Sequence, residues 1–139
     1  MSNKIIRAAF ETRLATWAAA RSPALRIAYQ NASFEPPADS GTYLRATLLP
    51  APVDSLDLAG AHRLYRGVFQ VDIIFKTGTN TGGATSIADE LIALFPLNLG
   101  ITQSGLTVYV REAMSDGPVL VDAAMTTLPV FCSYRADTP

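Results

Sequence analysis

Residues 62–76 read HRLYRGVFQVDIIFK, and this stretch carries the strongest local signal of secondary structure in the sequence. Successive side chains of a β-strand point to opposite faces of its sheet. One face of this stretch receives Phe69, Val71, Ile73 and Phe75, and the other receives Gln70, Asp72 and Ile74. Because an apolar face of this length must be covered, we predict a long, central strand here.

Shorter strands are predicted on both sides of it by the same two-residue period. Alternation appears over residues 25–29, 42–49, 106–110 and 128–134. Pro129 lies within the last of these strands. Since proline has no N–H for a sheet ladder, we expect that strand at a sheet edge or at a bulge.

Two other segments have the period of a helix. The first runs from Lys4 to Arg21, with apolar residues spaced by four, four and three at Ile6, Phe10, Leu14 and Trp17. The second covers residues 84–95, and the proline that follows ends it.

The order of these elements indicates the fold class. Most neighbouring strands are joined by segments too short for a crossover helix, which favours antiparallel pairing. We predict an α+β fold, with a mainly antiparallel sheet and two principal helices packed on one face. A length of 139 residues fits one domain, residues 1–139.

Three connections remain. Residues 31–41 are proline-containing and predict an extended loop, and residues 53–61 show no firm periodicity. Because long loops without their own structure are frequently functional, residues 50–61 are a candidate contact surface. Residues 77–83 read TGTNTGG and predict a flexible turn; a phosphate-binding P-loop would need a Lys followed by Ser or Thr at the helix start.

Composition excludes several function classes. Eleven basic and twelve acidic residues give a net charge of −1, which argues against strong, sequence-independent nucleic-acid binding. One Cys and one His make neither an intrachain disulfide nor a structural zinc site, so we expect no metal. No signal peptide or membrane-spanning segment is evident, so we expect no membrane contact and a location in the cytoplasm where the chain is made.

Catalytic signatures are weak. His62 has no evident partner for a catalytic triad, and no GxSxG motif appears. Cys132 alternates with apolar residues, so we expect a buried, inert thiol. Asp89 and Glu90 are adjacent, and neighbours on a helix point about 100° apart, so they form no ready metal pair. We predict no enzyme, no catalytic residue and no cofactor.

The start of the long strand gathers His62, Arg63, Tyr65 and Arg66. Arg and Tyr are enriched in protein interfaces, so these four residues are our candidate interface. The alternative is a solvated strand end.

Four segments together resemble a family of tailed-bacteriophage proteins, the tail-terminator-like proteins. They read RIAYQNASFEPP, TYLRATLLPAP, HRLYRGVFQVDIIF and IADELIALFP, and the resemblance spans nearly the whole chain. It implies a structural virion protein, without catalytic residues or cofactor, that forms a ring of six subunits and caps the tail tube of a long, noncontractile-tailed phage.

The resemblance also implies partners and a location. The partners are the major tail-tube protein and the head-completion connector protein, with DNA passing through the bore without specific binding. The location is the virion tail, reached by assembly in the host bacterial cytoplasm, from a phage or a prophage. Two alternatives remain open: a small-ligand or regulatory binding domain, and a component of the head–tail connector.

Overall fold

A computed structural model describes residues 3–21, 24–30, 32–37, 41–55, 58, 63–78 and 82–137. The elements are α1 (Asn3–Ala20), β1 (Ile27–Ala28), β2 (Tyr43–Pro50), β3 (Asp54–Ser55), β4 (Arg63–Lys76), α2 (Gly82–Leu94), β5 (Gly100–Gln103), β6 (Leu106–Asp116), β7 (Leu120–Val121) and β8 (Met125–Asp137). The α+β fold class predicted from the sequence is confirmed.

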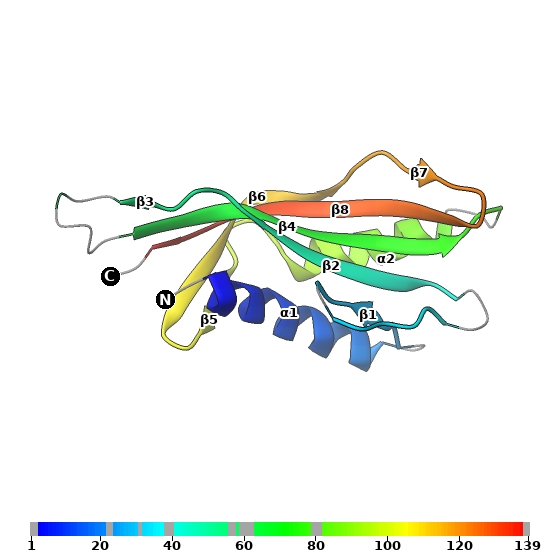
Figure 1. The fold of residues 1–139 in the computed structure, drawn as a ribbon, viewed down its shortest axis with the longest axis horizontal. Coiled ribbons are helices and arrows are strands. Elements are labelled where there is room, and N and C mark those ends of the chain that lie inside the picture. The colour runs from blue at the N-terminus through cyan, green and yellow to red at the C-terminus, as the bar shows by residue number, and fades with distance from the viewer. Residues whose placement is uncertain are drawn as a thin grey trace.

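The eight strands form one sheet in the order β1-β2-β4-β8-β6-β5, with β3 paired to β4 and β7 paired to β8. All pairings are antiparallel except that of β1 with β2. As predicted, β4 is long and central, and both helices lie on one side of the sheet (Figure 1). We call the side that carries no helix the open face.

The core lies between the helices and the sheet. Phe10 of α1 stacks on Phe69 of β4 with 4.6 Å between ring centroids, and Phe95, just after α2, lies 5.7 Å from both rings. Polar contacts tie the two helices together. Arg13 Nε donates to the Leu94 carbonyl at 2.9 Å, and Arg21 makes a salt bridge of 2.7 Å with Glu90.

The structure excludes the edge position that was one of the two predicted for Pro129. Its strand, β8, is not at an edge, because it lies between β4 and β6. In an antiparallel strand the N and the carbonyl of a residue point to the same side. The Pro129 carbonyl accepts from Gly117 N at 2.8 Å, so the missing N–H faces the break between β6 and β7. The proline therefore interrupts no regular ladder.

Three other expectations change. The predicted loop over residues 53–61 contains β3, which pairs with the first residues of β4. Gly82 and Gly83 belong to α2 and not to the preceding turn, of which residues 79–81 lie outside the described residues. Strand β5, which forms a hairpin with β6, is not among the predicted strands. Ser104 and Gly105, between the two strands, have the positive φ angles of a tight hairpin turn.

Candidate interface surface

The four candidate interface residues are not brought together. Alternation along β4 sends Arg63 and Tyr65 toward the helix side and Arg66 toward the open face. Tyr65 is 6% exposed and belongs to the core, so it offers little surface to a partner. His62 lies outside the described residues.

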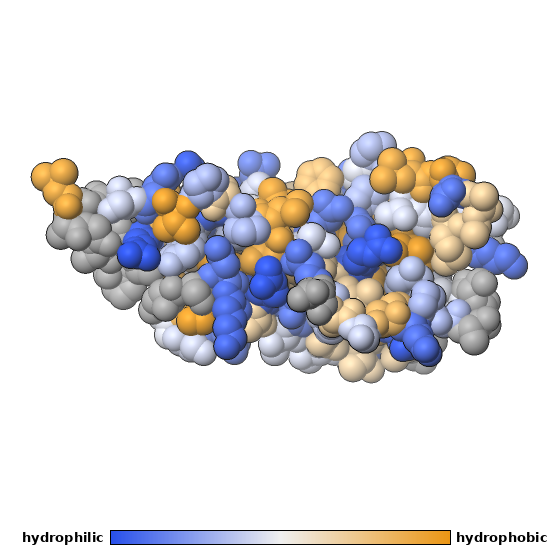
Figure 2. Space-filling model, viewed as in Figure 1, coloured by the Kyte–Doolittle hydropathy of each residue, from blue (hydrophilic) through white to orange (hydrophobic). Residues whose placement is uncertain are grey.

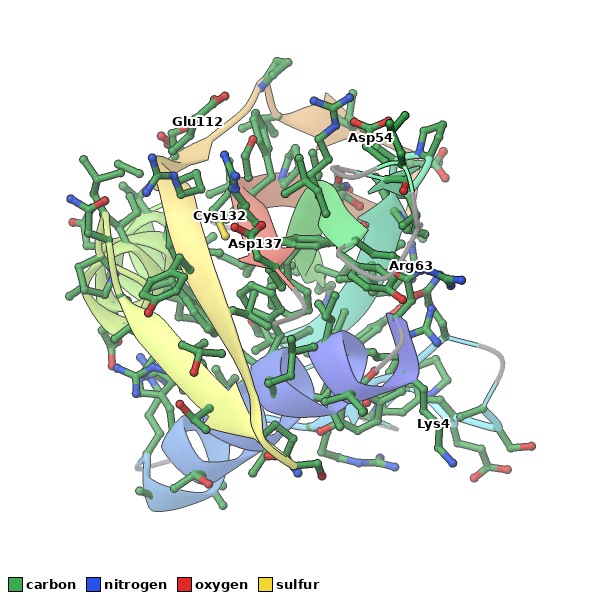
Figure 3. The ribbon with its side chains drawn as sticks, turned by 90° about the vertical axis from the view of Figure 1, so that its left-hand side faces the viewer. Lys4, Asp54, Arg63, Glu112, Cys132 and Asp137 are labelled. Carbon is green, nitrogen blue, oxygen red and sulfur yellow. The ribbon has the colours of Figure 1, made fainter. Side chains whose placement is uncertain are left out.

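Arg66 belongs to a set of paired charges at the end of the sheet where β3 lies, which we call the β3 end. Its guanidinium lies 2.8 Å from the Asp54 carboxylate, and its Cα partner on β8 is Arg135. Arg135 in turn lies 3.1 Å from Asp137, and this hydrogen bond raises the pKa of Arg135. Figure 3 views this end directly, with Asp54 and Glu112 on the side of the sheet away from α1.

A groove of about 410 Å³ lies among these charges, formed by β4, β6 and β8; we call it the β3-end groove. Its apolar lining comes from Ala51, Leu64, Gly67 and Val68. Its charged lining comes from Arg66, Arg111, Arg135 and Glu112. Among the described residues, Arg111 and Glu112 have no ion pair. The groove therefore presents an apolar surface with an excess of arginine around it.

Gly67 fixes the shape of the strand beside this groove. A Cβ at this position would lie 2.5 Å from the Leu49 carbonyl oxygen and 2.7 Å from the Tyr134 hydroxyl. Tyr134 is its Cα partner on β8, so the tyrosine side chain fills the space that the glycine leaves. Burial raises the pKa of Tyr134 to about 12. Only a glycine lets β2 and Tyr134 approach β4 this closely.

At the opposite end of the sheet, which we call the β7 end, apolar side chains are exposed. Val119, Leu120 and Val121 are 41%, 60% and 72% exposed, and Phe131, nearer the middle of β8, is 38% exposed. Figure 2 shows this apolar group over the region that Figure 1 labels β7. Proteins usually protect a strand edge of this kind, so an exposed apolar edge is a candidate contact surface.

A second hollow, of about 390 Å³, lies between β2 and the segment that follows β1. Tyr43, Arg45 and Thr47 of β2 line it together with Phe34. The Phe34 ring lies 5.1 Å from the Tyr43 ring and 4.9 Å from the Arg26 guanidinium carbon. These ring contacts fold the segment against the open face.

The residues considered for chemistry do not assemble into a site. Cys132 is 2% exposed, and burial raises its pKa to about 12, so the thiol is buried and unreactive as expected. The described residues include no group of three or more His, Cys, Asp or Glu side chains placed to hold a metal. Within the same residues, neither helix combines the length and apolarity needed to cross a membrane.

Comparisons with known proteins identify relatives. A family model described as phage tail terminator protein matches residues 5–134, from α1 to near the end of β8. A solved structure whose name carries no functional description is similar over 98% of this chain and 96% of its own, with 48% sequence identity and a TM-score of 0.84. The comparison with curated proteins found no match.

Proposed function

The chain belongs to the phage tail terminator family, and on this premise we propose that it ends tail growth by capping the tail tube as a ring. Its role in the phage tail is structural, and the virion tail is its location. In the proposed mechanism the ring binds the last ring of the major tail-tube protein. The edge to which further tube subunits would add is then covered, so growth stops.

One observation carries this proposal: the family match extends over residues 5–134 and so includes nearly all of both helices and of the sheet. A match confined to a turn or a single strand would support a shared fold fragment. A match of this extent supports a shared role in the tail, with tail and head–tail proteins as partners.

A ring of identical subunits constrains the surface. In a closed ring each subunit uses two different patches, one for each neighbour. The β3-end groove and the exposed β7 end are two such patches of different character. We propose six subunits, with the opposite side of the ring facing the head-completion connector protein. Arg63 and Arg66 remain our proposed interface residues.

The charge balance is compatible with passage of DNA through the bore. A net charge of −1 supplies no general cationic excess, and a strongly basic bore would retain the phosphate backbone. We therefore propose that the ring lets DNA pass without binding it specifically.

The test uses purified protein and the tail-tube protein encoded in the same phage genome. Mass is measured by light scattering after size exclusion over a concentration series, with and without preformed tubes, and the largest species are imaged by negative stain. We expect rings, free or at tube ends, and tubes that no longer elongate. Tubes that elongate normally with an excess of this protein would contradict the proposal.

The same measurement separates the two alternatives. A connector component would bind the head-completion protein and leave tube elongation unchanged. A small-ligand or regulatory domain would be stabilised by a saturable ligand, so nucleotides and inorganic phosphate are screened for a rise in melting temperature. If no compound raises the melting temperature, the ligand alternative is contradicted, since it rests on the glycine-rich turn before α2.

A further inference from the structure

We propose that strand β7 of one copy docks in the β3-end groove of a second copy, and that this contact is the repeated joint of the ring. The inference rests on the proposed function, because it names the surfaces that join neighbouring subunits. Its elements are the exposed apolar β7 edge and the arginine-rimmed groove, which lie at opposite ends of one sheet (Figure 1).

The β7 edge is built to be paired. Its strand is hydrogen-bonded to β8 on one side, and among the described residues no strand pairs with the other side. Unpaired backbone groups beside exposed Leu120 and Val121 form a template for a further polypeptide chain. An isolated subunit would leave this edge and its apolar side chains in water.

The turn that carries β7 is held firmly. Thr77 Oγ1 donates to the Asp122 carbonyl at 2.6 Å and lies 2.9 Å from Thr126 Oγ1. Asp122 N donates to the Met125 carbonyl at 3.2 Å, which closes the turn into β8. The strand is therefore presented in a fixed conformation, which lowers the entropy cost of docking.

The two surfaces are complementary in polarity and charge. Exposed aspartates, Asp116 and Asp122, stand on either side of the apolar residues 119–121. The groove is complementary to this arrangement, because three arginines and one glutamate lie around its apolar residues. Arg66 and Arg135 have carboxylate partners within the subunit, but their side chains stay 56% and 45% exposed, so they can meet a carboxylate from outside together with Arg111, which has no ion pair among the described residues.

The distance between β7 and the β3-end groove means that β7 docks in the groove of a second copy and not in its own. The groove lies beside residues 133–135 of β8, and β7 pairs with Thr126 and Thr127 of the same strand. At about 3.3 Å per residue these sites are about 25 Å apart along β8, so β7 cannot reach its own groove. Opposite placement is compatible with a head-to-tail contact, and such contacts form a closed ring where the rotation from one subunit to the next closes.

A strand of this size is a small contact. Stable interfaces bury about 800 Å² on each partner, so this joint needs neighbouring loops and the tube to complete it. We therefore expect association that rises steeply with protein concentration and that tail tubes strengthen.

Charge-reversal variants test this contact. Their self-association is measured beside that of the wild-type protein, with and without preformed tail tubes. Asp116→Arg with Asp122→Arg should weaken self-association at least about tenfold, as should Arg111→Asp with Arg135→Asp. Combining all four changes should restore part of the loss. Asp89→Arg, an exposed acidic site on α2, is the matched control and should associate as the wild type does. Unfolding by denaturant checks that each variant is folded.

Disulfide trapping gives a second readout. Leu120→Cys combined with Ser133→Cys should yield a ladder of cross-linked oligomers under mild oxidation, whereas mixing the two single variants should yield dimers and no ladder. Native Cys132 does not interfere, because it is buried and its pKa is raised. Leu120→Cys that cross-links to itself would show two-fold pairing of β7 and overturn the inference.

The outcomes separate the inference from the proposed function. If the Asp116 and Asp122 variant still forms rings that cap tubes, the joint lies elsewhere, and the function stands. If the wild type forms no ring and does not stop tube growth, the proposed function fails and the joint fails with it.

Discussion

The two halves of strand β4 have different surroundings, although they are one continuous strand. Residues 71–75 are buried on both faces of the sheet. Among residues 63–68, Leu64 and Tyr65 are buried, Arg63 and Arg66 are exposed, and Gly67 and Val68 are half-buried. Even Asp72, in the first group, is only 9% exposed and accepts a hydrogen bond of 2.7 Å from Gln70. Burial along the strand therefore depends on which layers cover it and not on its backbone.

The covering layers account for the difference. On the helix side, Phe10 of α1 stacks on Phe69. On the open face, Phe34 packs against Tyr43, whose Cα partner is Ile74. No equivalent segment covers the open face at the β3 end among the described residues, and the groove lies there. The covered half supplies stability, and the uncovered half leaves surface available for assembly.

The largest effect is expected in the core beneath the helices. Phe10→Ala removes a ring that contacts Phe69, Phe95 and Tyr134, and should lower the free energy of unfolding by about 3–5 kcal/mol. The matched control, Phe131→Ala, removes an aromatic ring that is 38% exposed and should cost less than about 1 kcal/mol. Equal losses in urea titrations would mean that the helix-covered core is not the main source of stability.

The boundary between the halves is tested at Gly67. Gly67→Ala places a Cβ against backbone atoms of Leu49 and Pro50, so we expect a loss of about 1–3 kcal/mol. Gly83→Ala is the control, because it lies in α2 with open space around it and should stabilise by about 0.5–1 kcal/mol. Thermal unfolding of both variants measures these changes. If Gly67→Ala were as stable as the wild type, β2 would have to move away from β4 at little cost.

A smaller effect is expected where the helices are joined. Glu90 has a lowered pKa, first because of its hydrogen bond with Arg21, so the pair contributes stability above the ordinary carboxyl pKa of 4.5. That contribution is lost as the pH falls through the lowered pKa. Glu90→Gln should cost about 0.2–1 kcal/mol at pH 7, and the difference from wild type should vanish in acid. If wild type and Glu90→Gln still differed in stability at pH 2, the difference would come from packing and not from the ion pair.

The smallest effect on stability is expected in the uncovered half. Arg66→Gln breaks an ion pair whose side chains are 56% and 45% exposed, so unfolding should change by less than about 0.5 kcal/mol. Self-association on tail tubes should nevertheless weaken, whereas Arg45→Gln, an exposed arginine of β2, should leave it unchanged. A large loss of stability in Arg66→Gln would mean that this end of the sheet is held by its charges.

Local patterns predicted the main elements well, for physical reasons. The alternation over residues 69–75 and the four-residue spacing of Ile6, Phe10 and Leu14 are set by backbone geometry that each segment has on its own. Pro96 ends α2 as expected, since a proline cannot continue the helix. The family resemblance also came from sequence, through core and turn residues spread along the chain.

Other features depended on contacts between distant segments. Two-residue strands such as β3 and β7 are too short to show a period, and they form because β4 and β8 offer them an edge. The hairpin of β5 and β6 had a usable signal, the Ser-Gly pair at residues 104–105, which gives a tight turn.

The candidate interface shows the same division. The local pattern alone places Arg63, Tyr65 and Arg66 on one strand, with Arg63 and Tyr65 on one face and Arg66 on the other. The tertiary structure decided that Tyr65 is buried in the core, that Arg66 lines a groove with Arg111 and Arg135, and that β7 stays exposed at the other end. The alternation of side chains along a strand depends on neighbouring residues alone. The burial of those side chains and the register of strand pairing depend on segments far apart in the chain.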